Sequence, residues 1–509
     1  MHDVIIVGSG WAGSWAAKEL TQAGHSVLLL EAGPKHDPDT IRAPSPPQER
    51  HRLAVRRQFT QCKHPAYWVK NPRLFVDDRE NPYLSEGPEP FVWIRGRQLG
   101  GRSLTWGGVM PRFSNFELNA AALDGHGSHW PLTYTDLAPF YDEVEQFLPV
   151  HGGTEHTATL PAGRYAHSVQ MTAHERELKE HIARHWPDRP ALPCPGLPET
   201  AWPHGSTLHA LIPAALRTGK LEIRTDTIVA SLGLNADATR IAEVQCVDRR
   251  TCERFALPAR VVMLCASTIE SIRILLNSRG DCCPQGVANS SQLVGRYLLD
   301  HAATWMAGYI PGTDARPIEG ACAGNGLLIP RCQNVHDREP RWLRGYGIWA
   351  QAGRSDWLGL RAPSWNLCAM IEVLPDERNV VRLDDTCTDA WGIRSPSIRM
   401  SYTDNENGLL AHAERWMEGL VRSLDWRLER RGRTAPGGFV HELGGIRMGA
   451  DPATSVLNAR NQSWDCPNLY VTDGSCFVTA GWQNPALTIM ALSLRAARFL
   501  SREMSAGHL

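Results

Sequence analysis

Two uninterrupted runs of aliphatic residues lie near the start of the chain, at residues 4–7 and 27–30. Runs without a polar alternation are typical of strands that are buried on both faces of a parallel sheet. The residues between them follow a helical pattern that ends at Gly24. The chain is therefore predicted to begin with a strand–helix–strand unit.

A third aliphatic run, residues 259–265, is followed by a helical pattern at residues 267–276 that starts with Ser and Thr. This strand–helix step is expected to join the N-terminal parallel sheet, so that one domain is assembled from separated segments. Residues 221–225, 227–232 and 241–247 are predicted as strands with polar turns between them.

Alternating patterns at residues 367–373, 380–383 and 397–402 favour an antiparallel sheet with one covered face. The proline-rich stretch at residues 34–50 is predicted to be irregular and to follow the surface. Further helical patterns occur at residues 134–147, 174–185 and roughly 406–427. A cluster of basic residues at the end of the last helix is expected to be a solvated helix face rather than a binding patch: Arg427, Arg430, Arg431 and Arg433.

Composition excludes several classes of protein. The 53 Lys and Arg residues balance 54 Asp and Glu residues, which gives no reason to expect a nucleic acid, a membrane surface or a strongly charged partner. The first strand begins at the third residue and no stretch is apolar enough to cross a bilayer, so a cytoplasmic protein is expected. The 13 cysteines have no paired metal spacing, even at Cys282-Cys283, and are expected to be free thiols.

The turn after the first strand carries a glycine fingerprint. Gly8 permits the tight turn, Gly10 lets the backbone approach a pyrophosphate, and Gly13 lets the helix pack closely against the strand. The helix directs its positive end at the phosphates, and Glu31 after the second strand is placed to bind a ribose diol. This unit predicts a bound dinucleotide without distinguishing FAD from NAD.

The last seventy residues combine a histidine with a second helix start. His441 precedes a glycine-rich stretch, and Asn484 and Pro485 are predicted as the N-cap and first residue of a helix. An imidazole that accepts a hydroxyl proton and an amide that holds the oxygen would suit the oxidation of an alcohol by hydride loss to a flavin. Alternatively, Asn484 only caps its helix and His441 is a core histidine.

Several motifs resemble the glucose–methanol–choline (GMC) oxidoreductases, in that family's order and over nearly the whole chain. They are the N-terminal fingerprint, Gly100-Gly-Arg-Ser103 with Trp106, residues 294–301, residues 441–449, and Asp473 with the helix at Asn484-Pro485. Residues 389–393 and 441–445 look most like the bacterial branch that contains gluconate and fructose dehydrogenases and pyranose and C-glycoside oxidases.

The resemblance implies FAD, with His441 as the catalytic acid/base group and Asn484 as its partner at the flavin. It also implies that Asp473 and Gly474 lie by the pyrophosphate and ribityl chain, and that Val229 contacts the adenine through its backbone. Gly100, Gly101 and Ser103 would pass beside the isoalloxazine or pyrophosphate. The full set of expected cofactor-binding residues is Gly8, Gly10, Trp11, Ala12, Gly13, Glu31, Ala32, Arg97, Gly100, Gly101, Ser103, Trp106, Gly107, Val229, Ala266, Asp473, Gly474, Asn484, Pro485 and Ala486.

The expected fold class is α/β, with a Rossmann-like FAD-binding domain on a parallel sheet and a substrate domain on an antiparallel sheet with helices. At 509 residues, two intimately packed domains are expected. The FAD-binding domain is predicted to comprise residues 1–114, 221–301 and 440–509, and the substrate domain residues 115–220 and 302–439.

Two departures from the family pattern affect the chemistry. Some pyranose oxidases attach FAD through a histidine just before the tryptophan of the second glycine motif, where this chain has Thr105. Noncovalent FAD is therefore predicted. Membrane-bound sugar dehydrogenases carry a cysteine-rich stretch, whereas the corresponding region has Cys194 alone. Electrons are expected to leave to oxygen or a diffusible acceptor.

The leading hypothesis is FAD-dependent oxidation of a sugar, glycoside or polyol to a carbonyl, with hydride transfer to flavin N5. Two alternatives stay open: oxidation of a larger hydroxylated metabolite in secondary metabolism, and a lyase of the same fold that keeps FAD without a redox reaction. The segments near residues 50–90 and 305–365, expected to form substrate loops, carry no pattern that separates these hypotheses.

Overall fold

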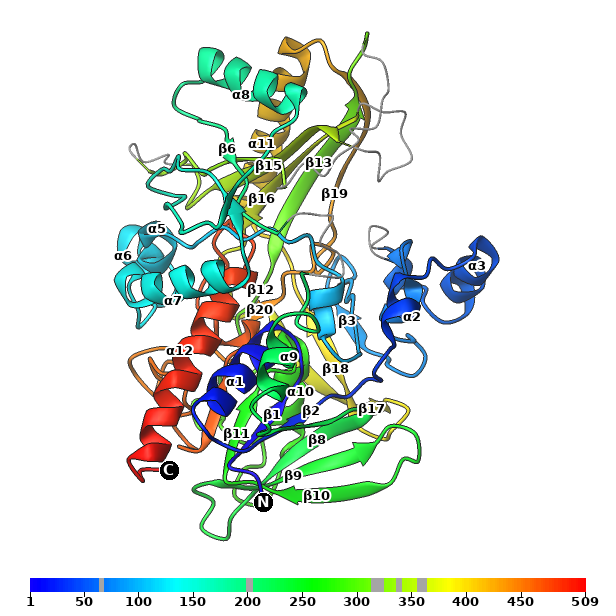
Figure 1. Ribbon diagram of the computed structural model, residues 1–509, viewed down its shortest axis with the longest axis vertical. Helices are drawn as coiled ribbons and strands as arrows, with labels where there is room; N and C mark the ends of the chain where they lie inside the picture. Colours follow the sequence, from blue (N-terminus) through cyan, green and yellow to red (C-terminus); the bar gives the residue numbers. More distant parts are fainter. Residues whose placement is uncertain (64–67, 198–204, 313–324, 336–340, 355–363) are drawn as a thin grey trace.

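The computed structural model describes residues 1–63, 68–197, 205–312, 325–335, 341–354 and 364–509. A five-stranded parallel sheet lies in the lower half of the molecule in Figure 1. Every residue is buried in four of its strands, those at residues 4–7, 27–30, 261–264 and 469–471. The parallel α/β domain predicted from the aliphatic runs is confirmed. The strand order is β21 (Leu469–Val471), β11 (Val261–Leu264), β1 (Val4–Val7), β2 (Val27–Leu30) and β7 (Leu221–Arg224).

Helices from distant parts of the sequence pack around this sheet. Helix α1 (Trp11–Gln22) packs against α12 (Ala486–Ser505) and α9 (Leu211–Leu216), and the Ser493 hydroxyl of α12 donates to the Ala12 carbonyl at 2.7 Å. Helix α10 (Thr268–Asn277) follows β11, as the Ser/Thr start predicted. A three-stranded antiparallel sheet completes this part: β8 (Thr227–Leu234), β9 (Ile241–Asp248) and β10 (Arg254–Pro258).

A six-stranded antiparallel sheet forms the upper half of the molecule in Figure 1. Helices α8 (Ala173–His185) and α11 (Asp404–Ser423) pack against its strands. The prediction of one covered face is wrong, because residues 365–372 are buried on both faces of the sheet, and residues 380–383 and 397–399, predicted for the same sheet, lie in a different one. Its order is β19 (Arg427–Arg433), β13 (His301–Tyr309), β16 (Ser364–Glu372), β15 (Tyr346–Arg354), β14 (Leu327–Ile329) and β6 (Leu192–Pro193).

A small sheet and a two-stranded ladder join the two halves. Strand β18 (Arg394–Arg399) pairs with β17 (Val380–Thr388) on one side and with β3 (Leu84–Glu86) on the other, and β17 and β18 contact α10. Strand β12 (Leu298–Leu299) pairs with β20 (Leu443–Gly444). The predicted domain boundaries stay a prediction.

The remaining described elements are short, apart from α7. The helices are α2 (Pro38–Arg42), α3 (Pro47–Arg56), α5 (Asn115–Leu118), α6 (Ala120–Asp124) and α7 (Tyr134–Phe147); the strands are β4 (His151–Gly152) and β5 (His167–Ser168); and 3₁₀ turns span Gln61–Lys63, Pro72–Leu74, Gly101–Leu104 and Gly474–Cys476.

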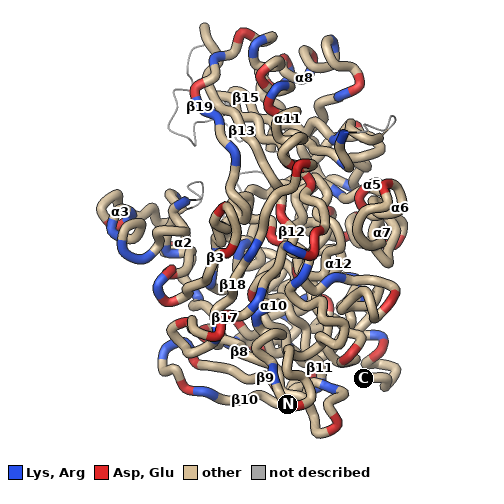
Figure 2. The backbone as a smooth tube through the Cα atoms, turned by 180° about the vertical axis from the view of Figure 1, so that it is seen from behind, with Lys and Arg blue, Asp and Glu red and all other residues tan. Residues whose placement is uncertain are grey.

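Two predictions of local structure are wrong. Residues 34–50 are not irregular, because Asp37 caps α2 through the amides of Asp39 and Thr40, and prolines start both α2 and α3. The arginine cluster lies on strand β19 (blue segments in Figure 2) rather than on a helix, although its residues are exposed as expected. The helix ends early because Asp425 has a positive φ of 52°, and Trp426 turns inward to stack on Trp365.

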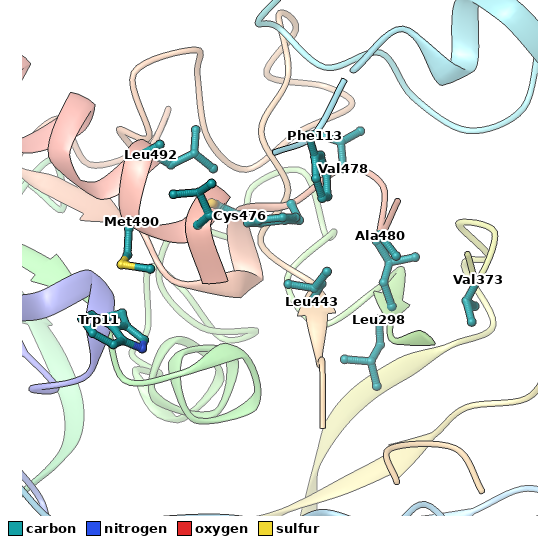
Figure 3. Close-up of a cluster of buried hydrophobic side chains, with 14 of the residues drawn as sticks. Trp11, Phe113, Leu298, Val373, Leu443, Cys476, Val478, Ala480, Met490 and Leu492 are labelled. Carbon is teal, nitrogen blue, oxygen red and sulfur yellow. The ribbon is translucent and has the colours of Figure 1, made fainter. Parts of the chain in front are cut away.

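A buried apolar cluster connects the helices of the lower half with the β12–β20 ladder (Figure 3). Leu298 and Leu443 face this cluster from the two paired strands, and both are fully buried. The segment that follows β12 and the segment that precedes β20 are therefore held against the body of the protein. Among the described residues, no helix has the length and apolar character needed to cross a membrane.

Candidate active site

One cavity opens at the carboxyl edge of the parallel sheet. Gly8, Glu31, Ala266 and Asp473 line it, and each follows one of the strands β1, β2, β11 and β21. This edge is where ligands bind in open α/β sheets, because the loops there leave a crevice outside the strand ends. The cavity also reaches His441 from the segment before β20.

Three glycines shape the cavity in different ways. Gly8 has a φ of 98°, and a Cβ there would lie 2.3 Å from the Cys265 carbonyl oxygen. A Cβ on Gly13 would lie 1.9 Å from the Gly8 carbonyl oxygen, so this glycine allows α1 to pack on β1. A Cβ on Gly10 would have no described atom within 4 Å, and Gly10 lines the cavity. The Gly10 side of the turn is therefore open for a ligand rather than for protein packing.

The start of α1 offers hydrogen-bond donors to this space. Gly10 is the N-cap and supplies no side-chain cap, so the amides of the first turn remain for a ligand. The Trp11 Nε1 atom is buried without a hydrogen-bond partner among the described residues. Open space, free helical amides and an orphaned donor fit the pyrophosphate of a dinucleotide.

Glu31 is held in place by the same turn. Its carboxylate accepts hydrogen bonds from the Ser9 hydroxyl, from the Ser9 amide at 3.2 Å and from the Gly33 amide at 2.9 Å. Burial raises the pKa of Glu31, and these hydrogen bonds oppose that shift. The side chain lines the cavity in the position predicted for a ribose-binding acid.

Sequence reasoning missed part of the lining. Arg95, beside the predicted Arg97, is 7% exposed and lines the cavity, and both lie close to Glu270. Burial opposes ionisation of Glu270, but Arg273, Arg97 and Arg95 outweigh it and lower its pKa to about 2. The alternating Arg95-Gly-Arg97 pattern before Gly100 was the available signal.

Asp473 is buried below the opposite side of the cavity. It accepts hydrogen bonds from the hydroxyls of Ser271 and Ser475, and burial raises its pKa against their effect. These hydrogen bonds fix the turn that follows β21. Gly474, the next residue in that turn, is thereby held in the lining of the cavity.

The structure brings most of the predicted cofactor-binding residues to this one cavity. Gly13 lies beneath the turn, Gly100 donates its amide to the Ser9 hydroxyl, and Trp106 packs edge-on against Trp11 with ring centroids 4.8 Å apart. Those three residues, together with Gly107, Asn484 and Ala486, do not line it. The predicted residues that do are Gly8, Gly10, Trp11, Ala12, Glu31, Ala32, Arg97, Gly101, Ser103, Val229, Ala266, Asp473, Gly474 and Pro485, with His441.

His441 and Asn484 face each other at the end of the cavity. The Asn484 Nδ2 atom lies 3.2 Å from the His441 Nε2 atom. The Asn484 Oδ1 atom is buried with no partner among the described residues. An amide nitrogen only donates, so His441 Nε2 is the acceptor in this pair. A hydroxyl group inserted between them could donate to His441 Nε2 and accept a hydrogen bond from Asn484 Nδ2.

The predicted capping role of Asn484 is wrong. Helix α12 begins at Ala486 with Pro485 as its N-cap, one residue later than expected, and no side chain caps it. The Asn484 Oδ1 atom makes no hydrogen bond to an amide of α12, and the Nδ2 atom contacts His441 instead. The interpretation of Asn484 as a structural cap is thereby excluded.

Two neighbours of His441 were not selected as site residues from the sequence. His301 Nδ1 lies 3.2 Å from His441 Nδ1, and the His441 amide donates to Asp300 Oδ1 at 3.1 Å. Arg102 forms an ion pair with Glu442 and donates to the Val440 carbonyl at 2.8 Å. The signal for Asp300 and His301 was their place in the family-like segment 294–301.

Comparison with known proteins agrees with this geometry. Residues 375–493 match the family model described as GMC oxidoreductase, and residues 6–56 match the NAD(P)-binding Rossmann-like domain. The chain therefore carries a GMC oxidoreductase domain in its C-terminal part and a Rossmann-like segment at its N-terminus. It is an oxidoreductase that acts on CH–OH groups, and the family indicates FAD as its cofactor.

Curated relatives align with this chain over nearly their whole length. The 2-methyl-1,2-propanediol dehydrogenase of Mycolicibacterium austroafricanum is 28% identical, with 99% of this chain and 96% of the relative covered. The fructose dehydrogenase large subunit of Gluconobacter japonicus is 26% identical, with 99% and 98% covered. A solved formate oxidase from Aspergillus oryzae, studied for its FAD modification, shares the fold with a TM-score of 0.70 at 13% identity, covering 99% of both chains.

Proposed function

We propose that this GMC oxidoreductase oxidises a sugar, glycoside or polyol to a carbonyl compound, with His441 as general base and Asn484 as the group that positions the substrate oxygen. The observation that carries the proposal is the 3.2 Å approach of Asn484 Nδ2 to His441 Nε2 beside the dinucleotide cavity. A diol and a sugar are named as substrates of the two relatives, which supports this substrate class.

The residues that would hold FAD are those of the cavity. Gly10 and the first amides of α1 would bind the pyrophosphate, Glu31 a ribose, and the turn at Asp473 and Gly474 the chain between pyrophosphate and flavin. Bound FAD supplies the hydride acceptor, at flavin N5.

His441 and Asn484 prepare the substrate hydroxyl. When the substrate hydroxyl replaces the contact between Asn484 and His441, His441 Nε2 accepts its proton, and the Asn484 amide donates a hydrogen bond that holds the oxygen. The proton and the hydride leave the same CH–OH group, so the product is a carbonyl compound. The Arg102–Glu442 ion pair ties the His441 segment to the glycine turn at residues 100–101 and limits its movement.

The test is an anaerobic titration followed by flavin absorbance near 450 nm, with 2-methyl-1,2-propanediol, D-fructose, simple glycosides and aminoglycosides as separate additions. Bleaching by a sugar or polyol is expected. Bleaching by an aminoglycoside alone would shift the assignment to a larger hydroxylated metabolite. Turnover with a permanently oxidised flavin would establish the lyase alternative instead.

We further propose that FAD is bound noncovalently. Thr105 occupies the position of the attachment histidine, and it is not part of the described cavity lining. His441 is the one histidine in that lining. Cys265 also lies in the lining, but burial raises the pKa of its thiol, and its Sγ atom lies 3.2 Å from the Thr472 hydroxyl.

Acid precipitation of the holoenzyme is therefore expected to release essentially all of the flavin into the supernatant. Absorbance of the supernatant and the mass of the denatured chain measure this directly. A protein pellet that stays yellow, with a mass increased by one FAD, would contradict the proposal.

We also propose that electrons leave to oxygen or to a diffusible acceptor rather than through an iron–sulfur relay. Cys194 is completely buried, and the described residues contain no group of three His, Cys, Asp or Glu side chains arranged for a metal ion.

A further inference from the structure

We propose that His301 is a positioning residue that holds His441 in the tautomer with its proton on Nδ1, which leaves the Nε2 lone pair for the substrate. This inference rests on the proposed role of His441 as the base. The juxtaposition that carries it is a continuous chain of contacts, from Asn484 Nδ2 through both ring nitrogens of His441 to His301 Nδ1.

The ladder between β12 and β20 places the two histidines together. Leu298 pairs with Gly444 and Leu299 with Leu443, in antiparallel register. Continuing that register by two residues sets His301 opposite His441. The chain is held at the backbone as well, because the His441 amide donates to Asp300 Oδ1. His441 is thus held both by its backbone amide and by its imidazole ring.

The protons along this chain of contacts follow from the donor inventory. Asn484 Nδ2 only donates, so His441 Nε2 accepts and carries no proton. A neutral imidazole then has its proton on Nδ1, and this N–H donates to His301 Nδ1 across 3.2 Å. His301 consequently has its own proton on Nε2, an atom that is buried without a hydrogen-bond partner among the described residues, although the Gly481 backbone acts to raise the pKa of the ring.

His301 can accept only while it is neutral, and its surroundings keep it so. It is fully buried, it packs beside Phe439 at 6.0 Å between ring centroids, and burial lowers its pKa to about 4. The titratable and charged groups around it are His441, Asp300, the Arg102–Glu442 ion pair, and Glu372, which pairs with His301 across β13 and β16 and is itself ion-paired with Arg344. Burial and the neighbouring Glu442 raise the pKa of Asp300 to about 8, which limits the negative charge next to the imidazoles near neutral pH.

The pair His301→Asn and His301→Leu separates tautomer control from packing. Asparagine and leucine have similar size, but only the asparagine Oδ1 offers an acceptor where His301 Nδ1 lies. With the panel alcohol that bleaches wild-type flavin fastest, His301→Leu is expected to slow anaerobic flavin reduction on the order of 10²-fold, the scale of a general base in the wrong form. Substrate affinity should change far less, and His301→Asn should recover most of the rate.

A second readout needs no substrate. In holoenzyme labelled with ¹⁵N-histidine, with His441→Gln used to assign the signal, His441 is expected as the Nδ1–H tautomer in wild type and His301→Asn, and as a mixture or the Nε2–H tautomer in His301→Leu. An unchanged tautomer in His301→Leu, or equally slow asparagine and leucine variants, would overturn the role of His301. Failure of every alcohol to bleach wild-type flavin would instead refute the proposed function, while the nitrogen shifts would still test the tautomer.

Discussion

Flavin reduction by the alcohol substrate is expected to fall on the order of 10²-fold or more in His441→Ala, while FAD remains bound. The reason is that His441 Nε2 is the lone pair next to Asn484 Nδ2, and alanine leaves the substrate hydroxyl without a proton acceptor. The cofactor should stay because the glycine turn, Glu31 and the Asp473 turn are untouched by the change. Stopped-flow absorbance under anaerobic conditions measures the reduction rate, and the ratio of absorbance at 450 and 280 nm measures the bound FAD.

His181→Ala is a matched control for this variant. His181 is also a largely buried histidine, and its Nε2 atom lies 2.8 Å from the Ser423 hydroxyl, between helix α8 and the end of α11. It should therefore report the cost of removing a packed imidazole outside the cavity, with reduction rates close to wild type. A His441→Ala enzyme that reduces its flavin as fast as His181→Ala would remove His441 from the mechanism.

Replacement of Gly10 by leucine is expected to yield a folded protein that lacks FAD. A Cβ at Gly10 meets no described protein atom within 4 Å, so the chain can accommodate it, but the side chain would occupy the space at the start of α1. Overpacking typically costs about 1–3 kcal/mol, and about 1.4 kcal/mol already weakens binding tenfold. Flavin content after purification and after incubation with excess FAD measures the loss, and far-UV circular dichroism measures folding.

Gly419→Leu tests whether a leucine on any exposed glycine has the same effect. Gly419 lies on the exposed side of α11, and a Cβ there also meets no described atom within 4 Å. Wild-type flavin content is expected in this variant. Full FAD occupancy in Gly10→Leu would show that the cofactor does not approach this turn. If Gly10→Leu does not fold, Gly10→Ala is the variant to measure, and a smaller loss of FAD affinity is expected for it.

The parallel sheet and its cofactor turn were predictable because their signals are local. Residues 4–7 and 27–30 are continuous aliphatic runs, and each glycine of the turn has a separate steric task that the structure shows. Helix α7 begins and ends where the pattern predicts, because a capping box at Thr133 starts it. The predictions of secondary structure were less accurate where residues distant in the sequence decide the local conformation. The arginines of residues 427–433 form a strand because β13 offers them an edge to pair with.

The sequence by itself determined the α/β class and the dinucleotide turn, because motif and spacing carry those features, whereas His441 and Asn484 were selected through the resemblance to a known family. Only the tertiary structure decided how that pair is supported. His301 and His441 are 140 residues apart, and the β12–β20 register alone sets them opposite each other. The Asn484 side chain contacts His441 rather than capping α12, whose N-cap is Pro485. Contacts of this kind depend on the packing of distant segments, which no local pattern encodes.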